Sequence, residues 1–215
     1  MLFLFPVKSM AQGMEGGESL FGAYLGLGSA LQKSGMEVDG KDLSWGNVGA
    51  EFGLSYLYFP SAYVGIGAAL QLGAFQGSQS TEDVPGRWRW HTFKTDFEMV
   101  NQELMGIGRI NLNPSSSVRL YIPFGAGVVL SKASMRYTWD DYWKEEEEDY
   151  NFSFGWYAGI GVEFEQSERF SWGLEARYNS FKYDYSELAS FVGGHVSGKD
   201  TQRDYVSLVA TFHFK

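Results

Sequence analysis

The sequence predicts an all-β fold, an up-and-down antiparallel β-barrel of about eight strands that crosses a membrane. Three observations lead to this prediction. Segment after segment alternates bulky apolar residues with glycine or polar residues, which is the two-residue period of a β-strand. The chain of 215 residues is 17% aromatic and includes 27 glycines but only 5 prolines, a composition that favours strands over helices. No run of about 18 apolar residues occurs, which excludes a membrane-spanning helix on length.

Charge and cysteine content exclude several classes of protein. The formal net charge is −9 and no basic stripe occurs, which argues against a nucleic-acid partner. Cysteine is absent, so disulfides, thiolate metal sites and cysteine nucleophiles are excluded. We expect residues 1–11 to be a truncated signal peptide, because a short apolar run is followed by Ser9-Met10-Ala11, with small residues where signal peptidase requires them. Residues 12–215 are then expected to form one barrel domain.

The alternation is clearest in two segments. From Val118 to Leu130 every even position is apolar, and from Phe152 to Phe164 the even positions are again apolar while glycine and polar residues dominate the odd ones. An outward face of that length with no polar residue requires an apolar environment, which a membrane provides. Six further segments follow the pattern, the fourth of them in chain order more weakly: 21–27, 48–56, 64–72, 97–111, 172–178 and 206–214.

The segment 97–111 is ambiguous, because its apolar residues do not keep strict alternation and glycines stand at Gly106 and Gly108. If its odd positions faced lipid, Glu103 and Arg109 would be exposed there. An arginine at the middle of a membrane costs about 2 to 4 kcal/mol. The odd positions are therefore predicted to face the lumen.

Connections between these segments alternate between short and long. The short ones are 59–62, 113–117 and 165–169, and the long, polar ones are 30–44, 76–96, 132–150 and 181–204. A barrel with both termini in the periplasm has short periplasmic turns and longer extracellular loops, so the four long connections are predicted to be extracellular.

Three stretches carry a resemblance to a known family: VRLYIPFGAGVVLS (Val118 to Ser131), FGWYAGIGVEF (Phe154 to Phe164) and WGLEARY (Trp172 to Tyr178). They resemble the small outer-membrane barrels that include the transmembrane domain of outer membrane protein A and related porin-family barrels. The resemblance implies location in the bacterial outer membrane, contact with outer-membrane lipid and lipopolysaccharide, and recognition of the C-terminal strand by the barrel assembly machinery. Phe212 and Phe214 match that C-terminal signal, whereas Val209 and Lys215 depart from it.

Seven charged residues lie at positions that the alternation of the strands places on the inner side of the barrel. A barrel of about eight strands is just wide enough for side chains to fill its interior, so paired charges there are predicted to form a polar plug more readily than a conduction path. These residues are Glu51, Glu103, Arg109, Arg119, Glu163, Glu175 and Arg177.

Two long connections contain candidate binding residues. Arg87, Trp88, Arg89 and Trp90 alternate cation and aromatic ring, a pattern suited to lipopolysaccharide phosphates and acyl chains or to an interfacial girdle. The acidic and aromatic patch of the third long connection is predicted to be a solvated loop whose charges repel one another, because a run of carboxylates lacks the scaffold of a calcium or magnesium site. It nevertheless contains candidate binding residues. Its candidates are Trp139, Asp140, Asp141 and Trp143. No metal and no cofactor are predicted.

The leading functional hypothesis is a non-enzymatic outer-membrane protein whose loops serve envelope integrity or surface adhesion and binding, with an extracellular ligand at the loops. One alternative is a lipid A-modifying esterase, because His195 and Ser197 resemble the His-x-Ser pair of outer-membrane deacylases. The pair lacks an assignable orienting acid. The others are a narrow porin-like channel and a soluble ligand-binding barrel, which the continuous apolar faces oppose.

Overall fold

The computed structural model describes residues 15–31, 37–38, 41–42, 48–85, 90–139, 142–147, 150–183 and 201–215. The predicted signal peptide lies outside these residues. All regular structure among them is β, and no helix there is long and apolar enough to cross a membrane. The strands are β1 (Glu18–Ala30), β2 (Glu37–Val38), β3 (Lys41–Asp42), β4 (Val48–Ser61), β5 (Val64–Pro85), β6 (Trp90–Asn111), β7 (Val118–Trp139), β8 (Tyr142–Glu147), β9 (Asn151–Ser167), β10 (Phe170–Tyr183) and β11 (Thr201–Phe214).

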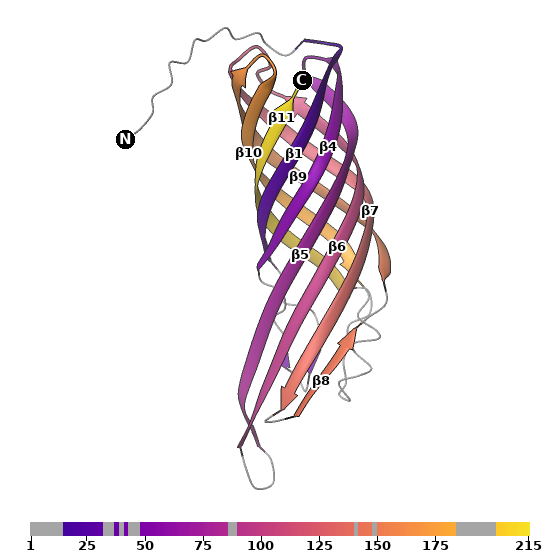
Figure 1. Cartoon of the computed structure of the whole chain (residues 1–215), viewed down its shortest axis with the longest axis vertical. Helices are drawn as coiled ribbons and strands as arrows, with labels where there is room; N and C mark the ends of the chain where they lie inside the picture. The colour runs from indigo at the N-terminus through magenta and orange to yellow at the C-terminus, as the bar shows by residue number, and fades with distance from the viewer. Residues whose placement is uncertain are drawn as a thin grey trace, which may run out of the picture.

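Eight of these strands close into one antiparallel barrel (Figure 1). Each barrel strand pairs with its neighbours in the chain, and β1 pairs with β11 to close the circle. The short strand β8 lies outside the circle and pairs only with the outer part of β7. Closure leaves no unpaired edge within the barrel wall, which is the condition for strands to cross a membrane. The predicted fold class is confirmed.

The outer surface of the barrel is apolar. On β7, Leu120, Ile122 and Phe124 are exposed, and the same alternation places Phe152, Phe154 and Trp156 of β9 on the outside. So many exposed large apolar side chains would be an aggregation hazard in water, whereas in a bilayer they face hydrocarbon. On β6 the odd positions face inward, as the cost of exposing Arg109 to lipid predicts: Glu103 and Arg109 are buried and Leu104 is exposed.

Five strands are longer than the sequence pattern indicates. β10 and β11 extend a few residues into the predicted connection 181–204, and three other strands extend much further. The connections 76–96 and 132–150 were expected as loops, but β5 continues to Pro85, β6 begins at Trp90 and β7 continues to Trp139. Figure 1 shows β5, β6 and β7 running well past the ends of β1 and β4, with β8 alongside β7. Beyond the membrane both faces of a strand meet water, so polar residues replace the alternation although the backbone pairing persists.

Glycines at inward positions make room for aromatic rings. A Cβ atom at Gly53 would overlap the ring of Tyr24 on the neighbouring strand, and a Cβ atom at Gly161 would overlap the ring of Tyr121. A ring lying over a glycine fills the lumen without pushing the strands apart, which explains why a chain so rich in aromatics is also rich in glycine.

Candidate functional site

The polar lumen is the most elaborate site in the described part of the chain, and side chains fill it from end to end. At the periplasmic end, where the short turns lie, Leu20, Leu57 and Phe59 form an apolar cluster against which Ile107 packs. The guanidinium of Arg109 lies 5.8 Å from the centre of the Phe59 ring. This apolar floor separates the charged side chains above it from the periplasmic opening.

The first charged layer is centred on Glu163. Both of its oxygens are used: Arg119 donates to Oε1, while Arg109 donates to Oε2, which is also 2.9 Å from Nδ1 of His213. Arg119 also donates to Glu165 at 2.7 Å. Four of these charged groups thus come from three different strands, β6, β7 and β9, and tie that side of the barrel together.

A second layer is centred on Arg177. Its Nε donates to Glu175, which also accepts a 2.8 Å hydrogen bond from the hydroxyl of Tyr121. The guanidinium lies between two aromatic rings, 4.5 Å from the centre of Tyr24 and 4.9 Å from that of Tyr157. The cation is therefore held by one carboxylate and two ring faces, an arrangement that favours a planar guanidinium over an ammonium.

The second layer continues toward the extracellular side through hydrogen bonds from uncharged donors. The Tyr24 hydroxyl donates to Gln71 at 3.0 Å, and the amide of Gln71 donates to Glu51 at 3.0 Å. The Tyr205 hydroxyl reaches the same Glu51 oxygen at 3.4 Å. Sequence reasoning missed Gln71 as a site residue, and also four tyrosines: Tyr24, Tyr121, Tyr157 and Tyr205. Their inward parity was readable, and the tyrosines sit beside glycines of neighbouring strands.

Aromatic rings close the lumen on the extracellular side. The ring of Tyr205 contacts Phe75 edge-on at 4.8 Å and Phe181 at 6.4 Å. The guanidinium of Arg203 lies 5.7 Å from the ring centres of both Phe75 and Phe97. All five side chains are buried, so they form a lid between the polar interior and the outside.

One small cavity remains between the two charged layers. It measures about 20 Å³, enough for one water molecule, and its wall includes Arg109, Arg177, Thr211 and His213. Arg109, Arg177 and Thr211 each have a buried polar atom without a hydrogen-bond partner in the structure. A water there would serve these atoms, whereas a cavity of this size is too small to hold a larger solute.

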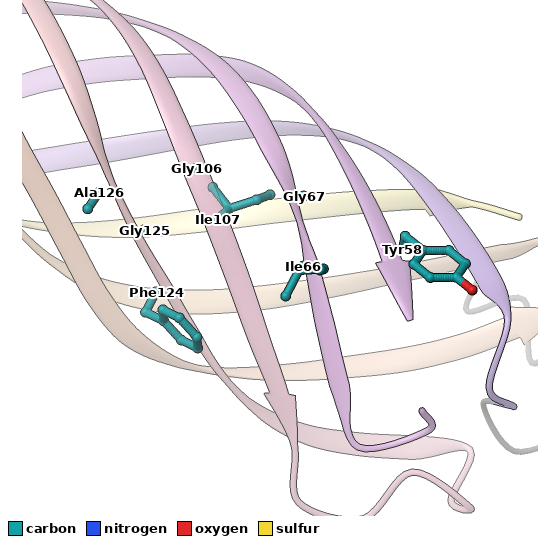
Figure 2. A pocket seen from close by; sticks show the side chains of 8 residues that line it. All are labelled: Tyr58, Ile66, Gly67, Gly106, Ile107, Phe124, Gly125 and Ala126. Atoms are coloured by element: carbon teal, nitrogen blue, oxygen red, sulfur yellow. The ribbon is translucent and has the colours of Figure 1, made fainter. Parts of the chain in front are cut away.

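The larger hollows lie on the outside of the barrel. Figure 2 shows one on the lipid-facing surface, where Gly106 and Ala126 form a low floor between the bulkier Ile66, Phe124 and Tyr58. Its lining is almost entirely apolar. A shallow, mostly apolar hollow of this kind suits contact with lipid chains more than recognition of a polar ligand.

The structure places the predicted residues as follows. The seven charged residues with lumen parity are all buried inside the barrel: Glu51, Glu103, Arg109, Arg119, Glu163, Glu175 and Arg177. Six of them belong to the hydrogen-bonded layers, and Glu103 does not. Trp90 begins β6, Trp139 ends β7 and Trp143 lies within β8. Outside the described residues lie Arg87, Trp88, Arg89, Asp140, Asp141, His195 and Ser197.

No group of three or more histidine or acidic side chains in the described part of the chain is arranged to hold a metal ion.

The chain was compared with protein-family models, curated proteins and solved structures. A family model described as outer membrane protein beta-barrel domain matches residues 1–214. No curated protein matches the chain. Among solved structures, the chain is similar to the outer membrane protein OprG of Pseudomonas aeruginosa, with 12% identity, 94% of this chain and 97% of that chain covered, and a TM-score of 0.49. It is similar to Neisserial surface protein A with 15% identity and a TM-score of 0.49, and the match covers 94% of this chain and 99% of that chain. The chain is also similar to the attachment invasion locus protein Ail of Yersinia pestis, with 13% identity and a TM-score of 0.44. The match covers 93% of this chain and 98% of that chain.

Proposed function

Because the chain belongs to the outer membrane β-barrel family and is a protein of the bacterial outer membrane, we propose that it is a non-enzymatic surface protein. Its closed barrel anchors an extracellular β-sheet that makes contact with molecules outside the cell. The observation that carries this proposal is the continuation of β5, β6 and β7 beyond the apolar band of the barrel.

The change in side-chain character marks where the membrane ends. Along the outer face of β7, Leu130 is followed by Lys132, Ser134 and Arg136, and on β5 Ala74 is followed by Gln76. Beyond this boundary the strands remain paired: Ser78 lies opposite Asp96, and Asp96 lies opposite Arg136. We call the part of β5, β6 and β7 beyond the boundary, together with β8, the extracellular sheet.

Backbone pairing makes the extracellular sheet a better binding surface than free loops. β8 pairs with β7 from Ser134 opposite Glu147 to Trp139 opposite Tyr142, which adds a fourth strand. A paired sheet loses little conformational entropy on binding, whereas a flexible loop must be ordered first. The candidate residues Trp90, Trp139 and Trp143 all belong to this sheet.

The first residues of the extracellular sheet also suit contact with the surrounding lipid. Lys132 and Arg136 occupy two of the first three outward positions beyond the apolar band of β7, with Ser134 between them. Basic side chains at this level lie beside the phosphates of outer-leaflet lipopolysaccharide, with which they form charge-assisted hydrogen bonds. We therefore include lipopolysaccharide among the proposed partners.

The test removes the extracellular hairpin and keeps the barrel. Residues 78–96 are replaced by Asn-Gly, a two-residue turn that joins Gly77 to its register partner Phe97. We expect the variant to reach the outer membrane and to keep the mobility shift on boiling that marks a folded barrel. Cells displaying it should adhere at least tenfold less than wild-type cells to immobilised matrix proteins, cultured epithelial cells or lipopolysaccharide-coated surfaces.

Equal adherence of wild-type and vector-only cells on all three surfaces would contradict surface binding. A role in envelope integrity is distinguished in the same strains. If the truncated barrel restores detergent resistance to a deletion strain as well as the full chain does, the barrel itself supports the envelope and the extracellular sheet has the separate binding role.

A further inference from the structure

The edge that β8 gives to the extracellular sheet is open in the described part of the chain. β8 is the last strand in the order of the sheet and pairs there only with β7 (Figure 1). Nearer the membrane, β9 occupies the same side of β7, as far as Asn151 opposite Ser131. Among the described residues, the other side of β8 has no strand partner for its backbone N–H and C=O groups, and such an edge is a template for a further strand.

The opposite edge of the extracellular sheet is less suited to a further strand. β5 pairs with β4 as far as Gln76 opposite Val48. Beyond this pair, β5 has an irregular register with β6 between Thr81 and Val84 and ends at Pro85, which has no backbone N–H. Bulges and prolines are devices that keep further strands from pairing. β8 has neither: its six residues include no proline, and its register with β7 is unbroken.

The edge at β8 is strongly acidic. Residues 140–149 read DDYWKEEEED, which is seven acidic residues and one lysine. The part of β7 that pairs with β8 contributes one basic residue, Arg136, which lies opposite Glu145. Successive residues of a strand belong to opposite faces, so the run from Glu145 to Glu147 gives negative charge to both faces of the edge.

Charge determines which strand pairs with this edge. A second copy of β8 would set glutamates opposite glutamates, and like charges directly opposite each other destabilise a pair of strands. A metal ion would neutralise carboxylates but would leave the backbone groups unpaired. In a strand rich in lysine or arginine, the backbone pairs with the edge and the cations lie opposite the glutamates. The acidic run thus protects the edge against self-association and leaves it open to a strand of opposite charge.

We propose that β8 binds an extended, lysine- or arginine-rich segment of an extracellular protein, which adds to the extracellular sheet as a further strand. Backbone hydrogen bonds along the six residues of β8 supply affinity, and the opposite charges select the segment and speed its approach. This inference rests on the proposed role in surface binding and names the class of partner.

The test uses labelled peptides that differ in charge and in the ability to form a strand. The full chain is folded in lipid nanodiscs, and binding is measured by fluorescence anisotropy. The first peptide alternates lysine and valine over about seven residues, enough to span β8. The second has the same sequence with every backbone nitrogen methylated, and the third has glutamate in place of lysine. We expect saturable binding of the first peptide, about tenfold weaker binding of the second because its N–H donors are gone, and no binding of the third.

Two double variants locate the binding site. Glu146→Lys with Glu147→Lys reverses two charges on β8 and should weaken binding of the lysine peptide about tenfold. Glu15→Lys with Glu168→Lys is the matched control, because both residues are exposed and lie at the periplasmic end, before β1 and between β9 and β10. The control makes the same change in net charge and should leave binding within about twofold of wild type, since charges this far away are screened by salt. The mobility shift on boiling verifies that both variants fold.

Equal binding of the unmodified and the methylated peptide would overturn strand addition, because charge alone would then explain the affinity. Equal losses in the two double variants would overturn the assignment to β8. If the lysine peptide does not bind although wild-type cells adhere to a test surface, this inference fails and the proposed surface binding stands. If wild-type cells do not adhere either, both fail.

Discussion

Arg119 on β7 and Glu163 on β9 occupy directly opposite register positions, and the guanidinium donates two hydrogen bonds to a single oxygen of the carboxylate. Both side chains are 0% exposed. The other oxygen of Glu163 accepts a hydrogen bond from Arg109 of β6. One carboxylate therefore binds two buried arginines from two different strands, which makes it the central acidic residue of the periplasmic half of the lumen.

Removing this carboxylate should destabilise the barrel strongly. Glu163→Gln leaves Arg109 and Arg119 without their shared counter-charge, and breaking a buried ion pair costs about 3 to 5 kcal/mol. The free energy of unfolding, measured by urea titration in lipid vesicles, should fall by that amount. Glu165→Gln is the control, because Glu165 accepts from Arg119 alone and should cost less. Equal losses in the two variants would mean that Glu163 is not central to the network.

The fit of aromatic rings over glycines makes a second prediction. In Gly161→Ala the new methyl group overlaps the ring of Tyr121, and overpacking of this kind costs about 1 to 3 kcal/mol. Gly106→Ala places a methyl group on the outer surface, 3.6 Å from the nearest atom, and should change the free energy of unfolding by less than about 0.5 kcal/mol. The same urea titration compares the two variants. A destabilising G106A with a neutral G161A would reverse the assignment of inner and outer faces.

The position of the membrane boundary on β6 can be measured with arginine. Leu104→Arg puts a cation near the middle of the outer apolar face and should cost about 2 to 4 kcal/mol, whereas Glu98→Arg beyond the end of that face should cost about 0 to 1 kcal/mol. Folding into vesicles with urea titration gives both values. Similar costs at the two positions would place Glu98 inside the hydrocarbon and shorten the extracellular sheet.

The filled lumen predicts an absence of conductance. The apolar cluster at Leu57, the stacked Arg177 and the ring of Tyr205 block the interior at three levels. Folded wild-type protein in planar bilayers should therefore show no stepwise current at moderate voltage. Reproducible single-channel steps would mean that these layers rearrange, and the narrow channel would then become the leading function.

Several features of the fold and the lumen could be predicted because they depend on parity alone. The segments from Val118 to Leu130 and from Phe152 to Phe164 alternate so regularly that their two faces are assigned without coordinates. This alternation places Arg119 and Glu163 inside. The ambiguous strand was resolved by one energy argument, the cost of Arg109 in lipid. Parity does not say which inward side chains touch, so Gln71 and Tyr205 were missed as partners of Glu51.

The sequence by itself determined a membrane barrel of alternating faces, the strands that build it and the charged residues that line it, because the bilayer imposes one rule on every outward position. The tertiary structure alone decided which charges pair and that β5, β6 and β7 continue as a sheet outside the membrane. These features depend on the register between strands and on the radius of the closed barrel, and both are set by contacts between residues far apart in the chain.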